Sequence, residues 1–262
     1  MHTTTLQPLG AELTDTDIAA LTDDQIGEVR SLLAEHGVVV FRDQHVDDDA
    51  FLAFLQRFGP LTFTAGETPV DGFPDLNVIS NVGRTEPPRS TFHVDSSYLS
   101  TPPAYTALRA VEIPSQGGET VFTNQYRAYE TLGDDVKARL EGATITHVVT
   151  GIDPSLLTED DETQAEHPVF RPHPLSGRTA LYMSTPKRCA AVSGLDDAEA
   201  AEVVAELYAH STTEENSHAH RWAPGDVVMW DNGCVLHRGD HSVVVGDRVM
   251  HRGMVADYGL DR

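Results

Sequence analysis

The chain is poor in cysteine and in long apolar runs. Two cysteines, Cys189 and Cys234, among 262 residues are too few for a disulfide framework. No apolar run approaches the roughly 20 residues that span a bilayer, and the N-terminus lacks the basic and apolar regions of a signal peptide. We therefore expect neither a membrane segment nor a leader, and the predicted compartment is the cytoplasm.

Basic side chains are also scarce, with 18 lysines and arginines against 41 aspartates and glutamates and a formal net charge of -23. Nucleic acids and anionic membranes both bind cationic protein surfaces. The charge therefore argues against both partners and favours a small-molecule substrate. A homo-oligomer is compatible with the sequence.

What the chain does contain is ordinary for a soluble globular protein, with 40% hydrophobic and 23% charged residues. We found no internal repeat, low-complexity linker or clear domain boundary, so the sequence predicts a single domain over residues 1–262. Residues 153–168 are acidic and poorly patterned, which is typical of a surface loop or a mobile lid.

Apolar periodicity predicts a few helices among many short strands. The helices are expected at residues 14–36, 47–58, 126–141 and 196–210. The strands are expected at residues 38–41, 76–79, 104–111, 119–123, 144–149, 169–174, 179–183, 219–222, 226–230, 242–245 and 248–254. This pattern favours a mainly β fold with covering helices, a β-sandwich or jelly roll.

The first motif that carries chemistry is His93-Val94-Asp95. Side chains alternate along an extended chain, so the histidine and the carboxylate lie on the same side of the backbone. They supply two of the three groups of the 2-His-1-carboxylate set, which binds non-haem Fe(II) and leaves open coordination positions. The third ligand is sought downstream, where composition alone leaves His237, His241 and His251 as alternatives.

Four motifs in order resemble those of the taurine dioxygenase (TauD/TfdA-like) family of Fe(II)- and 2-oxoglutarate-dependent oxygenases. They are His93-Val94-Asp95, Gly117-Gly118-Glu119-Thr120, Trp230-Asp231-Asn232 through His237, and Arg248-Val249-Met250-His251-Arg252. The similarity extends from about residue 8 to residue 256. It implies a double-stranded β-helix, the cupin-like form of the jelly roll, with Fe(II), 2-oxoglutarate and O2 as cofactor and cosubstrates.

The resemblance also implies roles for individual residues. His93, Asp95 and His237 resemble the iron ligands and are the predicted catalytic centre. Thr120 resembles the threonine that hydrogen-bonds the cosubstrate carboxylate. Among the cations, Arg252 resembles the arginine at the distal carboxylate of 2-oxoglutarate, and Arg248 resembles the one near the carboxylate that chelates iron.

The resemblance implies an enzyme that hydroxylates a substrate while 2-oxoglutarate becomes succinate and CO2. An intact Asp95 favours oxygenation over halogenation, because halogenating relatives carry a small residue there. Desaturation, cyclisation or carbon–heteroatom cleavage at the same iron centre stays an alternative. A non-catalytic, cupin-like metal-binding protein is an alternative of a different class, and it has no need of the arginine pair.

Family substrates contact the segments around the first histidine and the loop after the strand at 179–183. The residues that these segments supply here are Arg89, Phe92, Ser96, Ser97, Tyr98 and Lys187, with Thr62 or Thr64 beside them. Two cations in so acidic a chain favour an anionic or zwitterionic substrate, such as an amino acid, carboxylate, sulfonate or phosphonate. The competing interpretation is that Arg89 and Lys187 are exposed loop residues.

The remaining histidines have no matching partners in these motifs and are predicted to be structural. They include His147, His167, His173, His210, His218 and His220. By strand alternation, His251 is expected in the core or beside the site rather than in it. Cys234 is predicted to be a small buried residue and not a ligand.

Overall fold

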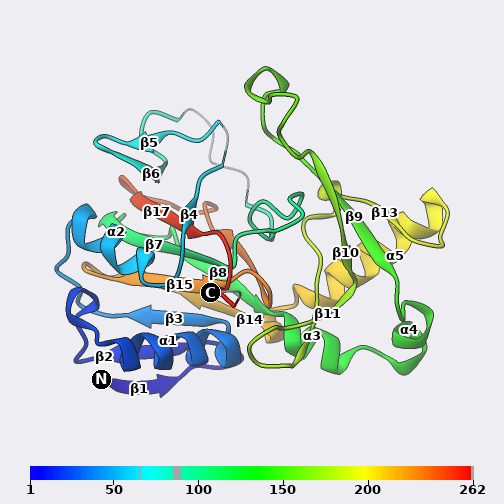
Figure 1. Ribbon diagram of the computed structural model, residues 1–262, viewed down its shortest axis with the longest axis horizontal. Helices are drawn as coiled ribbons and strands as arrows, with labels where there is room; N and C mark the ends of the chain where they lie inside the picture. Colours follow the sequence, from blue (N-terminus) through cyan, green and yellow to red (C-terminus); the bar gives the residue numbers. More distant parts are fainter. Residues whose placement is uncertain (65, 85–89, 261–262) are drawn as a thin grey trace.

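The computed structural model describes residues 1–64, 66–84 and 90–260. Figure 1 shows a large β-sheet with two helices on one side, and a second region in which a smaller sheet is covered by a long helix. The predicted mainly β architecture with covering helices is confirmed. In the described part of the chain, no helix is both long and apolar enough to cross a membrane.

The large sheet holds nine strands in the order β1-β2-β3-β15-β7-β17-β6-β5, with β4 paired to β17. Its strands are β1 His2–Thr5, β2 Ala11–Thr14, β3 Val38–Phe41, β4 Leu61–Thr62, β5 Pro69–Val70, β6 Phe73–Ser80, β7 Tyr105–Glu112, β15 Val227–Asp231 and β17 Val249–Val255. Apart from the β2–β3 pair, which is parallel, its neighbouring strands are antiparallel.

The smaller sheets complete the fold. One has the order β14-β8-β16, built from β14 Ser217–His220, β8 Thr120–Asn124 and β16 Val235–Gly239. A second has the order β10-β9-β13, built from β10 Gln164–Pro168, β9 Thr144–Val148 and β13 Cys189–Val192. A two-stranded ribbon pairs β11 Phe170–Pro172 with β12 Thr179–Leu181.

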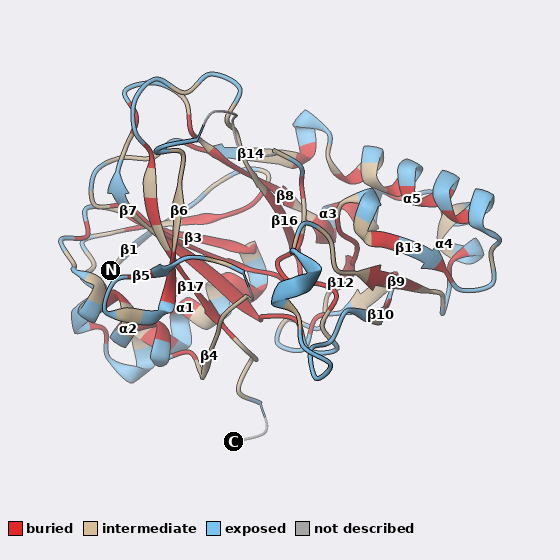
Figure 2. Ribbon diagram, turned by 90° about the horizontal axis from the view of Figure 1, so that it is seen from above, coloured by how far each residue is buried: buried red, intermediate tan, exposed pale blue. Residues whose placement is uncertain are grey.

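The helices are α1 Asp23–His36, α2 Asp48–Gln56, α3 Gln125–Thr131, α4 Asp134–Arg139 and α5 Asp197–Ser211, with short 3-10 turns at η1 Ile18–Ala20, η2 Pro154–Leu156, η3 Pro186–Arg188 and η4 Glu214–Asn216. Figure 2 shows α5 with its buried face toward the smaller sheet and its exposed face outward. This one-sided burial is what an amphipathic covering helix provides.

Several predicted boundaries are wrong. The helix expected at 14–36 begins only at Asp23, because Thr22 caps it with a hydrogen bond to the backbone N–H of Gln25. The helix expected at 126–141 is two helices, because Leu132 and Gly133 adopt extended backbone angles between them. Residues 242–245 form a turn with one isolated bridge, not a strand.

The loop predicted at 153–168 is shorter than expected. Residues 164–168 form β10, which pairs along its whole length with β9. The acidic residues before it lie in the exposed connection between these two strands, as Figure 1 shows at the tip of the hairpin. Backbone pairing with β9 therefore outweighs the polar composition that suggested a loop.

Strand alternation divides the core and directs the functional side chains. In β3, Val39 and Phe41 pack toward α1 and α2, whereas Val38 and Val40 pack between the large sheet and the β14-β8-β16 sheet. The space between these two sheets also takes Phe122, Trp230 and Met250. Side chains of the inner face on opposed strands therefore converge there, as in a jelly roll.

Candidate metal and cosubstrate site

Three predicted metal ligands meet between the sheets. His237 lies on β16, and His93 pairs with it through two backbone hydrogen bonds, one in each direction and each 3.0 Å long. The two imidazole centroids are 4.3 Å apart. Asp95 follows two residues after His93, and the three side chains offer ligand atoms that all lie within 4.8 Å of one another.

The spacing of these ligand atoms fits a shared cation better than direct hydrogen bonds. Nε2 of His93 is 3.6 Å from Oδ1 of Asp95, and Nε2 of His237 is 3.7 Å from Oδ2. Both separations exceed a hydrogen bond. Nδ1 of His93 lies 2.9 Å from the carbonyl oxygen of Thr91, which is the contact that leaves Nε2 free to bind a metal. The donor set thus fits a 2-His-1-carboxylate centre.

Asp95 is held as an anion in a buried position. Burial alone raises the pKa of its carboxyl group, but His237, Arg252 and His93 together hold that pKa well below its usual value. Its Oδ2 accepts a hydrogen bond of 2.8 Å from Thr106, whose hydroxyl oxygen accepts one of 2.9 Å from Asn232. These hydrogen bonds orient the Asp95 carboxylate through Oδ2 and do not involve Oδ1.

Arg248, immediately before β17, is a buried cation beside Thr120. Its Nη2 is 3.3 Å from the Thr120 hydroxyl, and its Nε donates to the carbonyl of Gly118 at 2.8 Å. Gly118 has a φ of 79°, and a β-carbon there would stand 3.0 Å from Cδ of Arg248, so glycine allows this close approach. Burial lowers the pKa of Arg248 to about 10. Among the described residues it forms no ion pair with a carboxylate.

Arg252 lies on β17 beside the metal-ligand cluster. Its Nη1 is 3.5 Å from Oδ1 of Asp95, and its Nη2 is 3.1 Å from Oε1 of Glu67. Its Nε donates to Oδ1 of Asn77 at 3.1 Å, and the Asn77 amide donates in turn to Oε2 of Glu67 at 3.1 Å. Arg252 is therefore already neutralised by a carboxylate of the protein.

The contacts of the two arginines favour the opposite order from the one expected. The sequence placed Arg248 near the iron end of the cosubstrate and Arg252 at its distal end. In the structure Arg252 approaches Asp95, and Arg248 lies with Thr120. Arg248 and Arg252 are four residues apart in one extended segment, so the sequence predicts their common face but not which of them lies nearer the metal.

The predicted substrate residues lie in different surroundings. Phe92 and Tyr98 are buried, and Phe92 packs in the core around β9, β13 and α5. Ser96, with a φ of 43°, shares a hydrogen bond of 3.1 Å with Thr64. The hydroxyl of Ser97 is buried and has no partner among the described residues. Arg89 lies outside the described residues.

Lys187 is exposed on η3, and the next residue, Arg188, faces the site instead. Nη1 of Arg188 donates to the carbonyl of Val94 at 2.9 Å, between the two ligands of the His-x-Asp motif. Burial lowers the pKa of Arg188, and Asp95 partly offsets that effect. The fold therefore turns Arg188, and not the predicted Lys187, toward the segment that carries His93 and Asp95.

Sequence reasoning missed four further residues that support the site: Glu67, Asn77, Thr106 and Asn232. Asn232 follows the Trp230-Asp231 pair and Thr106 lies on the inner face of β7, so motif position and strand alternation were usable signals. Glu67 lies in a connection between β4 and β5 and carries no such signal.

His251 and His173, which are not among the predicted iron ligands, make contacts within the protein. His251 lies on the other face of β17, with Nδ1 2.7 Å from Asp48 of α2. His173 lies 3.0 Å from Oδ2 of Asp231, and together with Cys234 these two form a second cluster with metal-ligand side chains. Cys234 is buried in the core and, as expected, burial raises the pKa of its thiol.

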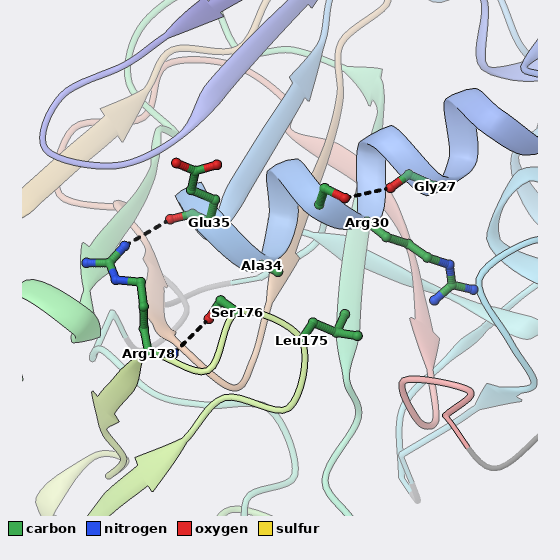
Figure 3. A pocket seen from close by; sticks show the side chains of 8 residues that line it. Gly27, Arg30, Ala34, Glu35, Leu175, Ser176 and Arg178 are labelled. Atoms are coloured by element: carbon green, nitrogen blue, oxygen red, sulfur yellow. Dashed lines mark hydrogen bonds between the residues drawn. The ribbon is translucent and has the colours of Figure 1, made fainter.

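A cavity of about 590 Å³ lies away from this site, between α1 and the turn after β11 (Figure 3). Arg178 on its wall donates to the carbonyl of Glu35 and pairs with Glu130 at 2.6 Å, and Arg30 donates to the carbonyl of Phe58 at 2.7 Å. The two arginines of this cavity therefore already have partners within the protein. The described lining contains none of the predicted site residues.

The chain is similar to known proteins over most of its length. Residues 2–254 match the model of the family described as "Taurine catabolism dioxygenase TauD, TfdA family". The alpha-ketoglutarate-dependent 2,4-dichlorophenoxyacetate dioxygenase of Cupriavidus pinatubonensis is 34% identical over 281 residues, covering 96% of this chain and 96% of that protein.

Solved structures show the same fold. A putative alpha-ketoglutarate-dependent taurine dioxygenase from Burkholderia xenovorans superposes with a TM-score of 0.86 at 30% identity, covering 98% of this chain and 93% of that one. AAD-2 in complex with Mn(II) and N-oxalylglycine superposes with a TM-score of 0.83 at 25% identity, covering 97% of each chain. The expected jelly roll is thereby confirmed.

Proposed function

Because the chain belongs to the TauD/TfdA family of dioxygenases, we propose that His93, Asp95 and His237 hold its Fe(II) and that Arg248, Thr120 and Arg252 surround its 2-oxoglutarate. The chain is an alpha-ketoglutarate-dependent dioxygenase that uses Fe(II), 2-oxoglutarate and O2. The substrate of the proposed reaction is a small anionic or zwitterionic molecule, hydroxylated with formation of succinate and CO2.

One observation carries the cosubstrate assignment: Arg248 is a buried guanidinium without a carboxylate partner among the described residues. A buried charge is costly unless an opposite charge pairs with it. A carboxylate of 2-oxoglutarate supplies that charge, and the planar guanidinium suits it. Thr120 adds a hydroxyl donor on the same side. We therefore assign the distal carboxylate to Arg248 and Thr120.

The other residues prepare the iron end. Thr106 and Asn232 orient Asp95, and the contact of His93 with Thr91 sets the tautomer that presents Nε2. Arg252 stabilises the ionised form of Asp95 from 3.5 Å. When bound, the iron and 2-oxoglutarate supply the oxidising chemistry. The chain's own residues hold these groups and fix where the substrate lies.

Substrate position decides the outcome of such a reaction, so desaturation, cyclisation or carbon–heteroatom cleavage stays an alternative to hydroxylation. A metal-binding protein without turnover is disfavoured, because Arg248 has no role in a site that binds only a metal. Cytoplasmic location and homo-oligomerisation stay predictions of the sequence.

The experiment is an anaerobic calorimetric titration of 2-oxoglutarate into the Fe(II)-loaded protein, followed by a succinate-release assay in air. Arg248→Met is expected to weaken 2-oxoglutarate binding by about 10- to 100-fold, the range of one charged hydrogen-bonding partner. The matched control is Arg221→Met, an arginine whose side chain is 89% exposed. Unchanged affinity in Arg248→Met, or absence of succinate release from the wild type with any tested substrate, would contradict the proposal.

A further inference from the structure

Three arginines surround the metal and cosubstrate site, and their charges are compensated differently. Arg248 receives a carboxylate of 2-oxoglutarate in the proposed function. Arg252 is paired with Glu67 at 3.1 Å and lies 3.5 Å from Asp95. Arg188 has no ion pair with any described residue.

Glu67 is the residue that distinguishes Arg252 from Arg188. Both of its carboxylate oxygens are used, Oε1 by Arg252 and Oε2 by Asn77. Asn77 also accepts from Nε of Arg252, so the three side chains form a closed ring of hydrogen bonds. A substrate anion at Arg252 meets a guanidinium whose charge Glu67 and Asp95 already offset, which weakens the attraction of Arg252 for that anion.

Arg188 offers a cation without this competition. It is partly exposed, and its described hydrogen bond is the one that Nη1 donates to the carbonyl of Val94. Its Nε is buried and has no hydrogen-bond partner in the described part of the chain, and its guanidinium carbon lies 5.8 Å from the ring centre of Tyr98. The backbone of Val94 and the ring of Tyr98 thus hold the guanidinium beside the segment that carries His93 and Asp95.

The sum of charges at the site leaves Arg188 uncompensated. The charges of Fe(II), Arg248 and Arg252 are balanced together by Asp95, Glu67 and the two carboxylates of 2-oxoglutarate. Arg188 then adds one positive charge. A monoanionic substrate neutralises the site, whereas a dianion leaves an excess negative charge in a partly buried position.

We infer that Arg188 binds the anionic group of the substrate, and that the Glu67–Arg252 ion pair restricts the enzyme to monoanions such as carboxylates, sulfonates or sulfate monoesters. This inference rests on the proposed function. It replaces Lys187 by Arg188 as the substrate cation and gives Glu67 a role in specificity, because Glu67 keeps Arg252 from attracting a second negative charge.

The test measures binding, with the Fe(II)- and 2-oxoglutarate-loaded protein kept anaerobic in a calorimeter. The probes are acetate, benzoate and 2,4-dichlorophenoxyacetate, each compared with its uncharged primary amide. The variants are Arg188→Met, Arg188→Lys, Lys187→Met and Glu67→Gln. The binding of 2-oxoglutarate itself, measured first, tests the proposed function separately, and a thermal unfolding scan confirms that each variant is folded.

In the wild type, at least one acid is expected to bind more tightly than its amide. Arg188→Met should reduce that preference by about 10- to 100-fold, Arg188→Lys should recover part of it, and Lys187→Met should retain it. Glu67→Gln tests the same inference without altering Arg188: freeing Arg252 should tighten binding of the acid several-fold and admit the dianion malonate.

Three results overturn the inference while 2-oxoglutarate still binds normally. They are no preference for any acid at millimolar concentration in the wild type, an unchanged preference in Arg188→Met, and a preference lost in Lys187→Met instead. Failure of 2-oxoglutarate to bind the wild type would contradict the proposed function and is recognised before any probe is added.

Discussion

Among the described residues, two groups of three metal-ligand side chains each contain histidine and aspartate, and they differ in how their polar atoms are used. In the metal-site cluster, His93 and His237 stand 3.6 and 3.7 Å from the oxygens of Asp95. In the second cluster, His173 and Asp231 lie 3.0 Å apart beside Cys234. The closeness of the side chains does not distinguish the two clusters, because in both of them the possible ligand atoms lie within 4.8 Å of one another.

The second cluster is closed by hydrogen bonds within the protein. Asp231 accepts from the Tyr258 hydroxyl at 2.6 Å and from the backbone of Gly233 at 2.8 Å. Nδ1 of His173 accepts from the backbone N–H groups of Leu175 and Ser176, which leaves Nε2 to donate to Asp231. In the metal-site cluster, the Nε2 atoms of His93 and His237 form no hydrogen bond with any residue that the structure describes. A site for an ion therefore requires polar atoms that converge and remain unpaired.

The largest expected difference between the two clusters is the loss of iron binding when a predicted iron ligand is removed. His93→Ala should lower iron affinity by more than 100-fold, because even a residue behind a ligand contributes 10- to 100-fold. Iron content after gel filtration should fall from about one per chain to near zero, and succinate release should be lost. His45→Ala, a histidine with an 83% exposed side chain, is the control. Full iron content in His93→Ala would remove this residue from the site.

The second cluster should respond in stability instead. Asp231→Ala leaves His173 and Tyr258 without their buried partner, so the free energy of unfolding should fall by about 3–5 kcal/mol. Urea unfolding of the iron-free protein measures it, with the exposed Asp153→Ala as control. Iron stoichiometry should not change. A stable variant that loses its iron would show that the two clusters had been assigned the wrong way round.

A smaller effect on iron binding is expected from Thr106, which is not a ligand but hydrogen-bonds to one. Thr106 donates to Asp95 at 2.8 Å, a hydrogen bond within the protein that orients a metal ligand. Thr106→Val should weaken iron binding by about 10- to 100-fold and lower the free energy of unfolding by about 1–3 kcal/mol, because Asp95 and Asn232 lose a buried partner. Competition with a coloured chelator measures the affinity, and Thr106→Ser should restore most of it. Equal affinities in the valine and serine variants would exclude the hydroxyl as the cause.

The smallest effect concerns His147, a buried histidine that belongs to neither cluster. Burial lowers its pKa from 6.5 to about 3, and both ring nitrogens lack partners among the described residues. Below pH 6.5, His147 is protonated in the unfolded chain but stays neutral in the folded protein. The free energy of unfolding therefore decreases as the pH falls. Between pH 6.5 and 5.5 this costs about 1 kcal/mol.

His147→Phe should remove that share of the pH dependence, as measured by urea unfolding at the two pH values. If His147→Phe and the wild type lose the same free energy over this interval, the ring is protonated in the folded protein and the assignment of a neutral His147 is wrong.

Much of the fold was accessible from the sequence because its elements have strong local signals. The buried run Val38–Phe41 became β3, and the periodic helices at α1, α2 and α5 were found with errors at their ends. Errors occurred where a tertiary contact decided the outcome. Residues 164–168 are polar and still form β10, because the neighbouring strand β9 supplies hydrogen bonds along the whole segment.

By itself, the sequence determined the metal-ligand types, the motif order and the common face of Arg248 and Arg252, because these depend on spacing along extended chain. The tertiary structure decided which arginine lies near Asp95, which of Lys187 and Arg188 turns inward, and that Glu67 neutralises Arg252. These outcomes depend on distances between segments far apart in the chain. Local spacing fixes which groups are present, but folding fixes which charges remain unpaired.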